Sequence, residues 1–302
     1  VTLTLPVDDG TADQVLATDG DGVLSWATSS GGASDIDGLS DAKSAGTNFT
    51  GSLLVGHQTT GTLDAATYNT GVGLTALDHL SSGDYNTAVG YSALTGNTTG
   101  FYNSALGSNA LRTNSTGHNN TASGYQALRT NSTGHYNSAM GTNALYSNTT
   151  ARYNTAMGYG ALQDANRTLD TDGYNVALGY NAGNTGTSDV ITGNLNTLLG
   201  ASTAASAAAG TNQTVIGYGA SGKGDNTVTI GNGDITVWSA ADDGEVDLGS
   251  NSVEFKDLYI DGTANLDAVD IDGGAIDGAA IGANSASTGA FTTVTASTSL
   301  DV

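Results

Sequence analysis

Short apolar clusters recur through the middle of the chain, and each is bounded by Gly, Asn, Ser and Thr. In the clearest copy, Ala88 and Val89 precede Gly90, Ala93 and Leu94 follow it, and a polar run then leads to the next cluster. Clusters this short, set between turn-forming residues, predict strands rather than helices. The pattern therefore indicates an all-β fold.

The spacing of the clusters is set by a ladder of glycines. Its eleven members are Gly56, Gly73, Gly90, Gly107, Gly124, Gly141, Gly158, Gly179, Gly200, Gly217 and Gly231. The intervals are 17 residues six times, then 21, 21, 17 and 14. One such unit cannot bury enough surface to offset its chain entropy, so the copies are expected to stack and share a core.

Four positions around each ladder glycine supply the apolar side chains of that core. The residue immediately before the glycine is apolar in every copy except the one with Ser123. The residue two positions before the glycine is small in most copies. Alanine stands three positions after the glycine in most copies, and leucine often stands at the fourth. We expect all four positions to face the shared core.

A 17-residue unit fits one coil of a narrow parallel β-solenoid, with roughly two strands of about five residues and two turns. The fold class predicted is a β-roll of about eleven coils, in which the ladder glycine needs a positive φ or has a close neighbour. The 21-residue intervals are interpreted as four-residue insertions in an outward turn, visible between Gln163 and Gly173.

The flanks differ from the repeats and divide the chain into five segments. We expect a β-hairpin module over residues 1–30, a connector over 31–51, the β-roll over 52–233, a β-hairpin module over 234–265, and an Asp-, Gly- and Ala-rich β-shaft segment over 266–302. In the first module, strands at 14–18 and 23–27 flank the tight turn Asp19–Gly22. The connector is expected to hold one helical turn near 39–44. The flanking modules are expected to cap the open strand edges of the roll.

The repeat Asn-[Ser/Thr]-Ala-apolar-Gly-x-x-Ala, seen in Asn86–Ala93 and Asn154–Ala161, resembles the head repeat of trimeric, YadA-like autotransporter adhesins. The longer coil, with Tyr-Asn before this motif and Ala-Leu after it, is more similar to repeats of bacteriophage tail fibres, marine ones especially. The flanks 5–26, 255–262 and 281–297 are similar to modules of such fibres. The resemblance implies a left-handed parallel β-roll in which three chains pack around one axis.

The resemblance implies a structural function without enzymatic activity. We expect a trimeric segment of a phage tail fibre that supports attachment to a host receptor, located outside the cell on the virion tail. Its partners would be its own copies, other tail or fibre proteins, and a glycan or protein of the host surface. A bacterial surface adhesin head is the alternative, and a tailspike depolymerase is a more remote one. The chain starts at Val1 without Met, so we expect it to be a fragment of a longer polypeptide.

Charge and composition exclude several other classes. The formal net charge is −22, and the acids lie mainly on the flanks, with eight in residues 1–50 and fourteen in 225–302. Nucleic-acid binding is disfavoured because phosphate contacts need clustered Lys or Arg. The chain has no Cys, which rules out disulfides and thiolate metal sites. No apolar run approaches the roughly 20 residues of a membrane span, so no membrane insertion is expected.

Aromatic residues recur at fixed repeat positions and form the candidate receptor-contact surface. This surface comprises Tyr85, Tyr102, His118, His135, Tyr136, Arg152 and Tyr153. Aromatic rows can stack on sugars, but rows at coil spacing more often pack on each other or on a neighbouring chain. That structural interpretation is the one we favour. His118 and His135 could alternatively form metal-binding rings around a threefold axis, although no His-x-His pair or nearby acid supports this.

The remaining motifs have simpler explanations in turn chemistry. Asp19–Gly22, Asp35–Gly38 and Asp270–Gly273 are similar to calcium loops, but none continues into the twelve-residue pattern with a terminal Glu. Turn formation explains the Asp-Gly pairs, so we expect no cofactor, with calcium the alternative. The Asn-x-[Ser/Thr] sequences that begin at Asn97, Asn114, Asn131 and Asn148 belong to one copied turn. No catalytic triad or phosphate-binding loop is present in the sequence.

Overall fold

A computed structural model describes residues 14–18, 23–28, 42–44, 50–56, 65–166, 172–186, 189–237 and 260. These residues contain strands and turns, with no helix among them. The chain divides into two compact units, Val1–Trp238 and Ser239–Val302. Of the β-hairpin module expected over 234–265, only residues 234–237 and 260 are described, and none of them lies in a strand. The β-shaft expected at 266–302 lies outside the described residues.

The first two strands form an antiparallel pair near the N-terminus. β1 (Gln14–Thr18) pairs with β2 (Leu24–Thr28), and Leu16 lies opposite Trp26. The second strand is one residue later than expected, and the turn between the strands is outside the described part of the chain.

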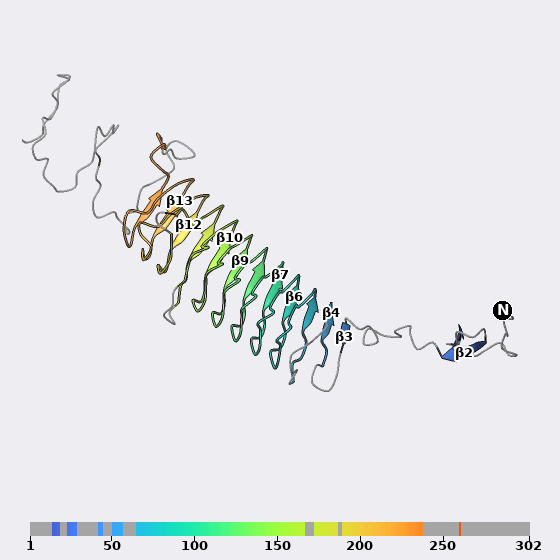
Figure 1. Ribbon diagram of the computed structural model, residues 1–302. Helices are drawn as coiled ribbons and strands as arrows, with labels where there is room; N and C mark the ends of the chain where they lie inside the picture. Colours follow the sequence, from blue (N-terminus) through green and yellow to red (C-terminus); the bar gives the residue numbers. More distant parts are fainter. Residues whose placement is uncertain are drawn as a thin grey trace, which may run out of the picture. The chain divides into compact units, whose positions relative to one another are not determined.

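The main structure is a β-solenoid of eleven parallel strands, β4–β14 (Figure 1). The strands are β4 (Leu53–Val55), β5 (Thr70–Val72), β6 (Thr87–Val89), β7 (Ser104–Leu106), β8 (Thr121–Ser123), β9 (Ser138–Met140), β10 (Thr155–Met157), β11 (Val176–Leu178), β12 (Thr197–Leu199), β13 (Thr214–Ile216) and β14 (Val228–Ile230). Each lies next to the following one, and equivalent repeat positions are paired, as in Ala88 opposite Ala105. The predicted fold class, a stacked β-solenoid, is confirmed.

The 21-residue intervals leave the stack unchanged. Thr155 of β10 is paired with Val176 of β11 across the first of them, in the same register as the 17-residue coils. The inserted segment at 167–171 lies outside the described residues. The extra residues therefore do not interrupt the sheet.

Each coil contains one strand of three residues, so our expectation of two five-residue strands is wrong. The other side of the coil consists of turns, and its backbone bonds directly to the next coil. The Leu94 N–H donates to the Ala110 carbonyl at 3.0 Å, and the Gly96 N–H donates to the Arg112 carbonyl at 2.8 Å. Leu94 has a φ of 50°, in the left-handed region, which is incompatible with a continuous extended strand.

The ladder glycines are required for two reasons that act together. Gly107 has a φ of 136°, which residues with a Cβ rarely adopt. A Cβ built at Gly107 would also lie 2.5 Å from the carbonyl oxygen of Gly124, its equivalent one coil away. The glycines thus allow the backbones of successive coils to approach closely, as the sequence predicted.

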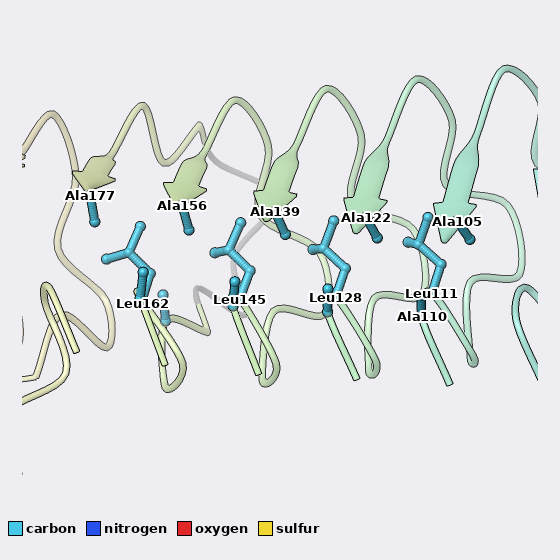
Figure 2. Close-up of a cluster of buried hydrophobic side chains, with 14 of the residues drawn as sticks. Ala105, Ala110, Leu111, Ala122, Leu128, Ala139, Leu145, Ala156, Leu162 and Ala177 are labelled. Carbon is cyan, nitrogen blue, oxygen red and sulfur yellow. The ribbon is translucent and has the colours of Figure 1, made fainter. Parts of the chain in front are cut away.

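The core consists of rows of alanine and leucine that run from coil to coil. Figure 2 shows Ala105 and Ala122 extending from their strands toward Leu111 and Leu128 on the opposite side of the coil. The positions two before, three after and four after the ladder glycine are buried throughout this region. These three predicted core positions are confirmed.

The fourth predicted core position, immediately before the glycine, is wrong. Leu106 is 57% exposed and Met140 is 51% exposed, whereas Ala105 and Ala139 beside them are buried. Successive side chains of a strand point to opposite faces, so two adjacent residues cannot both enter the core. These outward side chains form what we call the apolar stripe, which consists of Val55, Val72, Val89, Leu106, Ser123, Met140, Met157, Leu178, Leu199, Ile216 and Ile230.

Two buried ladders of asparagine complete the interior. Asn103 donates from Nδ2 to Asn86 Oδ1 at 3.1 Å and to the Gly117 carbonyl at 2.8 Å, and its backbone N–H donates to Asn86 Oδ1 at 3.0 Å. Equivalent contacts link consecutive members of the row Asn69, Asn86, Asn103, Asn120, Asn137, Asn154, Asn175 and Asn196. The side-chain oxygens of this row thus accept hydrogen bonds from their copies one coil away.

The second ladder rules out a glycosylation role for the copied turn. Asn97, Asn114, Asn131 and Asn148 are buried. Asn114 Nδ2 donates to Asn97 Oδ1 at 2.8 Å, and Asn131 Nδ2 donates to Asn114 Oδ1 at 2.7 Å. Their amide nitrogens are therefore inaccessible and already engaged, so these asparagines are structural.

The N-terminal end of the sheet is covered by the connector. β3 (Ala42–Ser44) pairs antiparallel with β4, with Lys43 opposite Leu54. The helical turn expected near 39–44 is therefore wrong for residues 42–44. An exposed strand edge offers unpaired backbone donors and acceptors, and pairing with β3 satisfies those of β4.

Candidate functional site

Tyrosines form a stacked row two residues before the strands. Tyr68, Tyr85 and Tyr102 stack with ring centroids 4.9 Å apart at each step. Tyr136 stacks on Tyr153 at 5.1 Å, and Tyr153 stacks on Tyr174 at 4.8 Å. All of these tyrosines have positive φ, between 46° and 58°, so the backbone directs each ring outward at the same place in its coil.

A second row lies directly beside the first, because its residues immediately precede the tyrosines. Phe101 stacks on His118 at 4.6 Å, and His118 stacks on His135 at 4.4 Å. Edge contacts join the two rows, as between Phe101 and Tyr102 at 5.5 Å and between His135 and Tyr136 at 5.4 Å. Arg152 follows His135 in this row, and its backbone forms a bridge to Asp172.

The two rows make one continuous surface, which we call the aromatic strip. It comprises Tyr68, Tyr85, Phe101, Tyr102, His118, His135, Tyr136, Tyr153 and Tyr174. The structure thus brings six of the seven predicted contact residues together and places Arg152 next in the His row. The rings pack on one another within one chain, in line with the interpretation that we favoured.

The tyrosine row is interrupted at one coil. Asn119 stands where the neighbouring coils have Tyr102 and Tyr136. Its backbone keeps the register of the stack, because the Asn119 N–H donates to the Phe101 carbonyl at 3.1 Å. We did not single out Asn119 from the sequence, although the substitution is visible there as the one copy between Tyr68 and Tyr174 that lacks tyrosine.

A third set of tyrosines flanks the apolar stripe at the other end of the strands. These residues follow the ladder glycines and are exposed: Tyr91, Tyr125, Tyr159, Tyr180 and Tyr218. Tyr159 and Tyr180 stack at 5.3 Å. Together with the apolar stripe, they form a band of exposed apolar surface beside the ladder glycines.

The environment of the aromatic strip shifts the pKa of some of its groups. Partial burial is the main cause that lowers the pKa of His118, and the neighbouring His135 adds to it. Desolvation and the adjacent Tyr102 and Tyr68 raise the pKa of Tyr85. A hydrogen bond to Asp172 is the largest cause that raises the pKa of Tyr174. Each of these three shifts favours the uncharged form of its side chain.

Within one chain, the geometry does not favour a metal site shared by His118 and His135. The metal-binding rings around a threefold axis stay a prediction, because they need further copies of the chain. His118 and His135 stack face to face with an interplanar angle of 11°. The lone pairs of imidazole nitrogens lie in the ring plane, so two parallel rings do not direct them at a common point. Among the described residues no group of three or more His, Cys, Asp or Glu is placed to hold a metal ion. The Asp-Gly loops considered for calcium lie outside the described ranges.

No protein-family model, curated protein or solved structure matches this chain. In the part of the chain that the structure describes, no helix has the length and apolar character needed to cross a membrane.

Proposed function

We propose that the solenoid is a rigid structural segment of a trimeric extracellular fibre, a phage tail fibre that supports attachment to a host. The observation that carries the proposal is the apolar stripe, whose side chains face outward along the strands instead of entering the core. Extended exposed apolar surface on a soluble protein is typical of an interaction surface.

Packing of copies side by side fits the geometry of this stripe. Each coil except the one with Ser123 presents an apolar residue at the same place on the strand face, so the surface runs parallel to the axis of the stack. Two or more parallel copies can then contact each other over every coil, and a ring of three closes the contacts without free surfaces. The flanking tyrosines that follow the ladder glycines would widen this interface.

The stack suits a mechanical function. Its eleven parallel strands span about 48 Å at a spacing of about 4.8 Å. Backbone hydrogen bonds and asparagine ladders join successive coils. These bonds make the stack stiff, because one coil cannot move without breaking its bonds to the next. Three copies would present each surface feature three times, and weak contacts to a host would add through effective concentration.

The head of a bacterial surface adhesin is the alternative function, and the apolar stripe supports it equally. The sequence resemblance to phage fibres in both flanks favours the first. The genes beside the parent reading frame discriminate between them, because capsid and tail genes would accompany a phage fibre.

Light scattering coupled to size exclusion tests the assembly. The chain has a mass of 29.9 kDa, and we expect a species of three times that mass at micromolar concentration. The double variant Leu106→Asp and Met140→Asp should dissociate it, because each charge would be buried at the interface. Thr99→Asp, at an exposed turn position, is the matched control and should remain assembled. A folded wild-type monomer would refute the trimer.

A further inference from the structure

The interruption at Asn119 creates the free ring faces of the aromatic strip. Inside a stack, each tyrosine covers the faces of its neighbours, so only ring edges reach solvent. The row consists of two triplets, Tyr68–Tyr85–Tyr102 and Tyr136–Tyr153–Tyr174, with Asn119 between them. One face of Tyr102 and one face of Tyr136 therefore border the coil that lacks a ring.

Side-chain exposure agrees with this arrangement. In the first triplet the middle ring, Tyr85, is 47% exposed, and the outer rings Tyr68 and Tyr102 are 54% and 53% exposed. In the second triplet Tyr153 is 37% exposed, and its neighbours Tyr136 and Tyr174 are each 47% exposed. Within each triplet, the ring next to Asn119 is thus more accessible than the middle ring, and it is about as accessible as the ring at the other end.

The gap between the two triplets has the thickness of one ring. Tyr102 and Tyr136 are two coils apart, about 9.6 Å at a strand spacing of about 4.8 Å. The stacked tyrosines of the row are 4.8 to 5.1 Å apart, so one further ring completes the sequence of stacked faces. We call this space the Asn119 gap, bounded by Tyr102, Tyr136, His118 and Asn119.

The other two sides of the gap are polar. His118 precedes Asn119 and contacts the edge of Tyr136 at 5.8 Å. Asn119 is half-buried, and its carboxamide takes part in none of the hydrogen bonds among the described residues. The gap therefore offers two apolar faces, together with amide and imidazole groups that donate and accept hydrogen bonds.

We propose that the Asn119 gap binds one pyranose ring of a glycan, stacked between Tyr102 and Tyr136. A pyranose presents C–H groups on its faces and hydroxyls around its edge, which matches apolar walls and a polar base. An inserted aromatic side chain would use the walls but leave the Asn119 carboxamide without a partner, which is unfavourable at a half-buried position. The phenol hydroxyls at the ring edges add further partners for the substituents of the sugar.

The charge of the gap favours a sugar ring that needs no counter-ion. Partial burial lowers the pKa of His118, which favours the neutral imidazole. The ring already has a hydrogen bond to the Thr116 backbone, and its other nitrogen can exchange hydrogen bonds with hydroxyls. The proposed site is formed by the coils of a single chain. It names the chemical class of the host contact in the proposed fibre, and it does not depend on the assembly of three chains.

Glycan-array binding by the full chain, followed by calorimetry on the glycans bound, tests the proposal. Asn119→Tyr is the decisive variant, because it fills the gap with the ring that the neighbouring coils carry. Tyrosine is compatible with the backbone there, since Asn119 has a φ of 55° and Tyr102 has a φ of 54°. We expect this variant to remain folded and to lose affinity at least about tenfold, a change of about 1.4 kcal/mol.

Tyr102→Ala and Tyr68→Ala form a matched pair, because each residue ends a triplet and stacks on Tyr85. Only Tyr102 borders the gap, so Tyr102→Ala should weaken glycan binding about tenfold and Tyr68→Ala should leave it unchanged. Equal effects of the two variants, retention of binding in Asn119→Tyr, or the absence of any bound pyranose on the array would overturn the proposal. Saturable binding of N-acetyl-tyrosine amide in place of sugars would do the same.

The two proposals can fail separately. If the wild-type chain is a monomer that binds glycans, and Asn119→Tyr loses this binding, the fibre proposal is refuted and the glycan-site proposal stands. A trimer that binds no glycan would refute the site and leave the fibre intact.

Discussion

The inside and the outside of the solenoid obey different rules. The inward positions repeat the same residue types coil after coil, as in the buried alanine and asparagine rows. The outward rows change along the stack, from Leu106 through Ser123 to Met140 and from Tyr102 through Asn119 to Tyr136. Inside, each side chain is fixed by its copy in the next coil. Outside, variation is tolerated, so the outward rows are where a contact can be introduced.

The largest effect is expected from the ladder glycines. Gly107→Ala would force a Cβ against the Gly124 backbone and requires an unfavourable φ, so we expect a loss of about 4 kcal/mol or more in the free energy of unfolding. Gly186 also has a positive φ, but no heavy atom lies within 4 Å of the position that a Cβ would occupy there. Gly186→Ala should therefore cost only about 1–2 kcal/mol. Urea denaturation compares the two, and equal losses would show that φ alone makes glycine necessary.

The next largest effect is expected from the inner asparagine ladder. Asn103→Ala removes the donor to the Gly117 carbonyl and the acceptor for the Asn120 N–H, and both groups are buried. We expect a destabilisation of about 3 kcal/mol, from two or more unsatisfied buried groups. Thr99→Ala, at an exposed turn, should change stability by less than about 0.5 kcal/mol. If Asn103→Ala destabilised the protein as little as Thr99→Ala, the asparagine ladder would contribute little to the free energy of unfolding.

A smaller effect of opposite sign is expected at the break in the outer row. Asn119→Tyr should raise the free energy of unfolding by about 0.5–1.5 kcal/mol, because the new ring stacks on Tyr102 and Tyr136. Thermal unfolding measures this change. A lower melting temperature would show that the two triplets are not aligned across the Asn119 gap.

The smallest effect is expected from pH. The pKa of His118 is lowered in the folded chain, so the unfolded chain binds the proton more readily. The contribution of His118 to stability is complete above its ordinary value of about 6.5 and decreases as the pH falls from there through the folded pKa. Stability curves of wild type and His118→Gln should converge in that window. Parallel curves would argue against this shift.

The glycines and the buried alanines and leucines were predictable because they recur at a regular interval and each repeat position accepts few residue types. Glycine and leucine recur in most coils at the repeat positions of Gly107 and Leu111, and this recurrence is enough to infer stacking. The outward direction of Leu106 was missed because apolar character was taken as a sign of burial, although Ala105 beside it already occupied the inward direction.

The asparagine ladders were not predictable from one repeat. Asn86 and Asn103 look like turn residues within their own coils, and their partners are 17 residues away in sequence. Only stacking brings the two amides within hydrogen-bonding distance. The absence of a second strand in each coil likewise follows from the left-handed backbone of residues such as Leu94, which sequence patterns do not reveal.

The most direct test of the account measures which face joins the copies. The chain has no cysteine, so Ser123→Cys introduces a single thiol for a spin label within the apolar stripe, and Thr99→Cys introduces one on an exposed turn. Pulsed electron paramagnetic resonance on each labelled protein measures the distance between the spin labels of neighbouring copies. We predict a short distance between labels at position 123 and a much longer one at position 99. A short distance at 99, or no distance between copies at either position, would contradict the account.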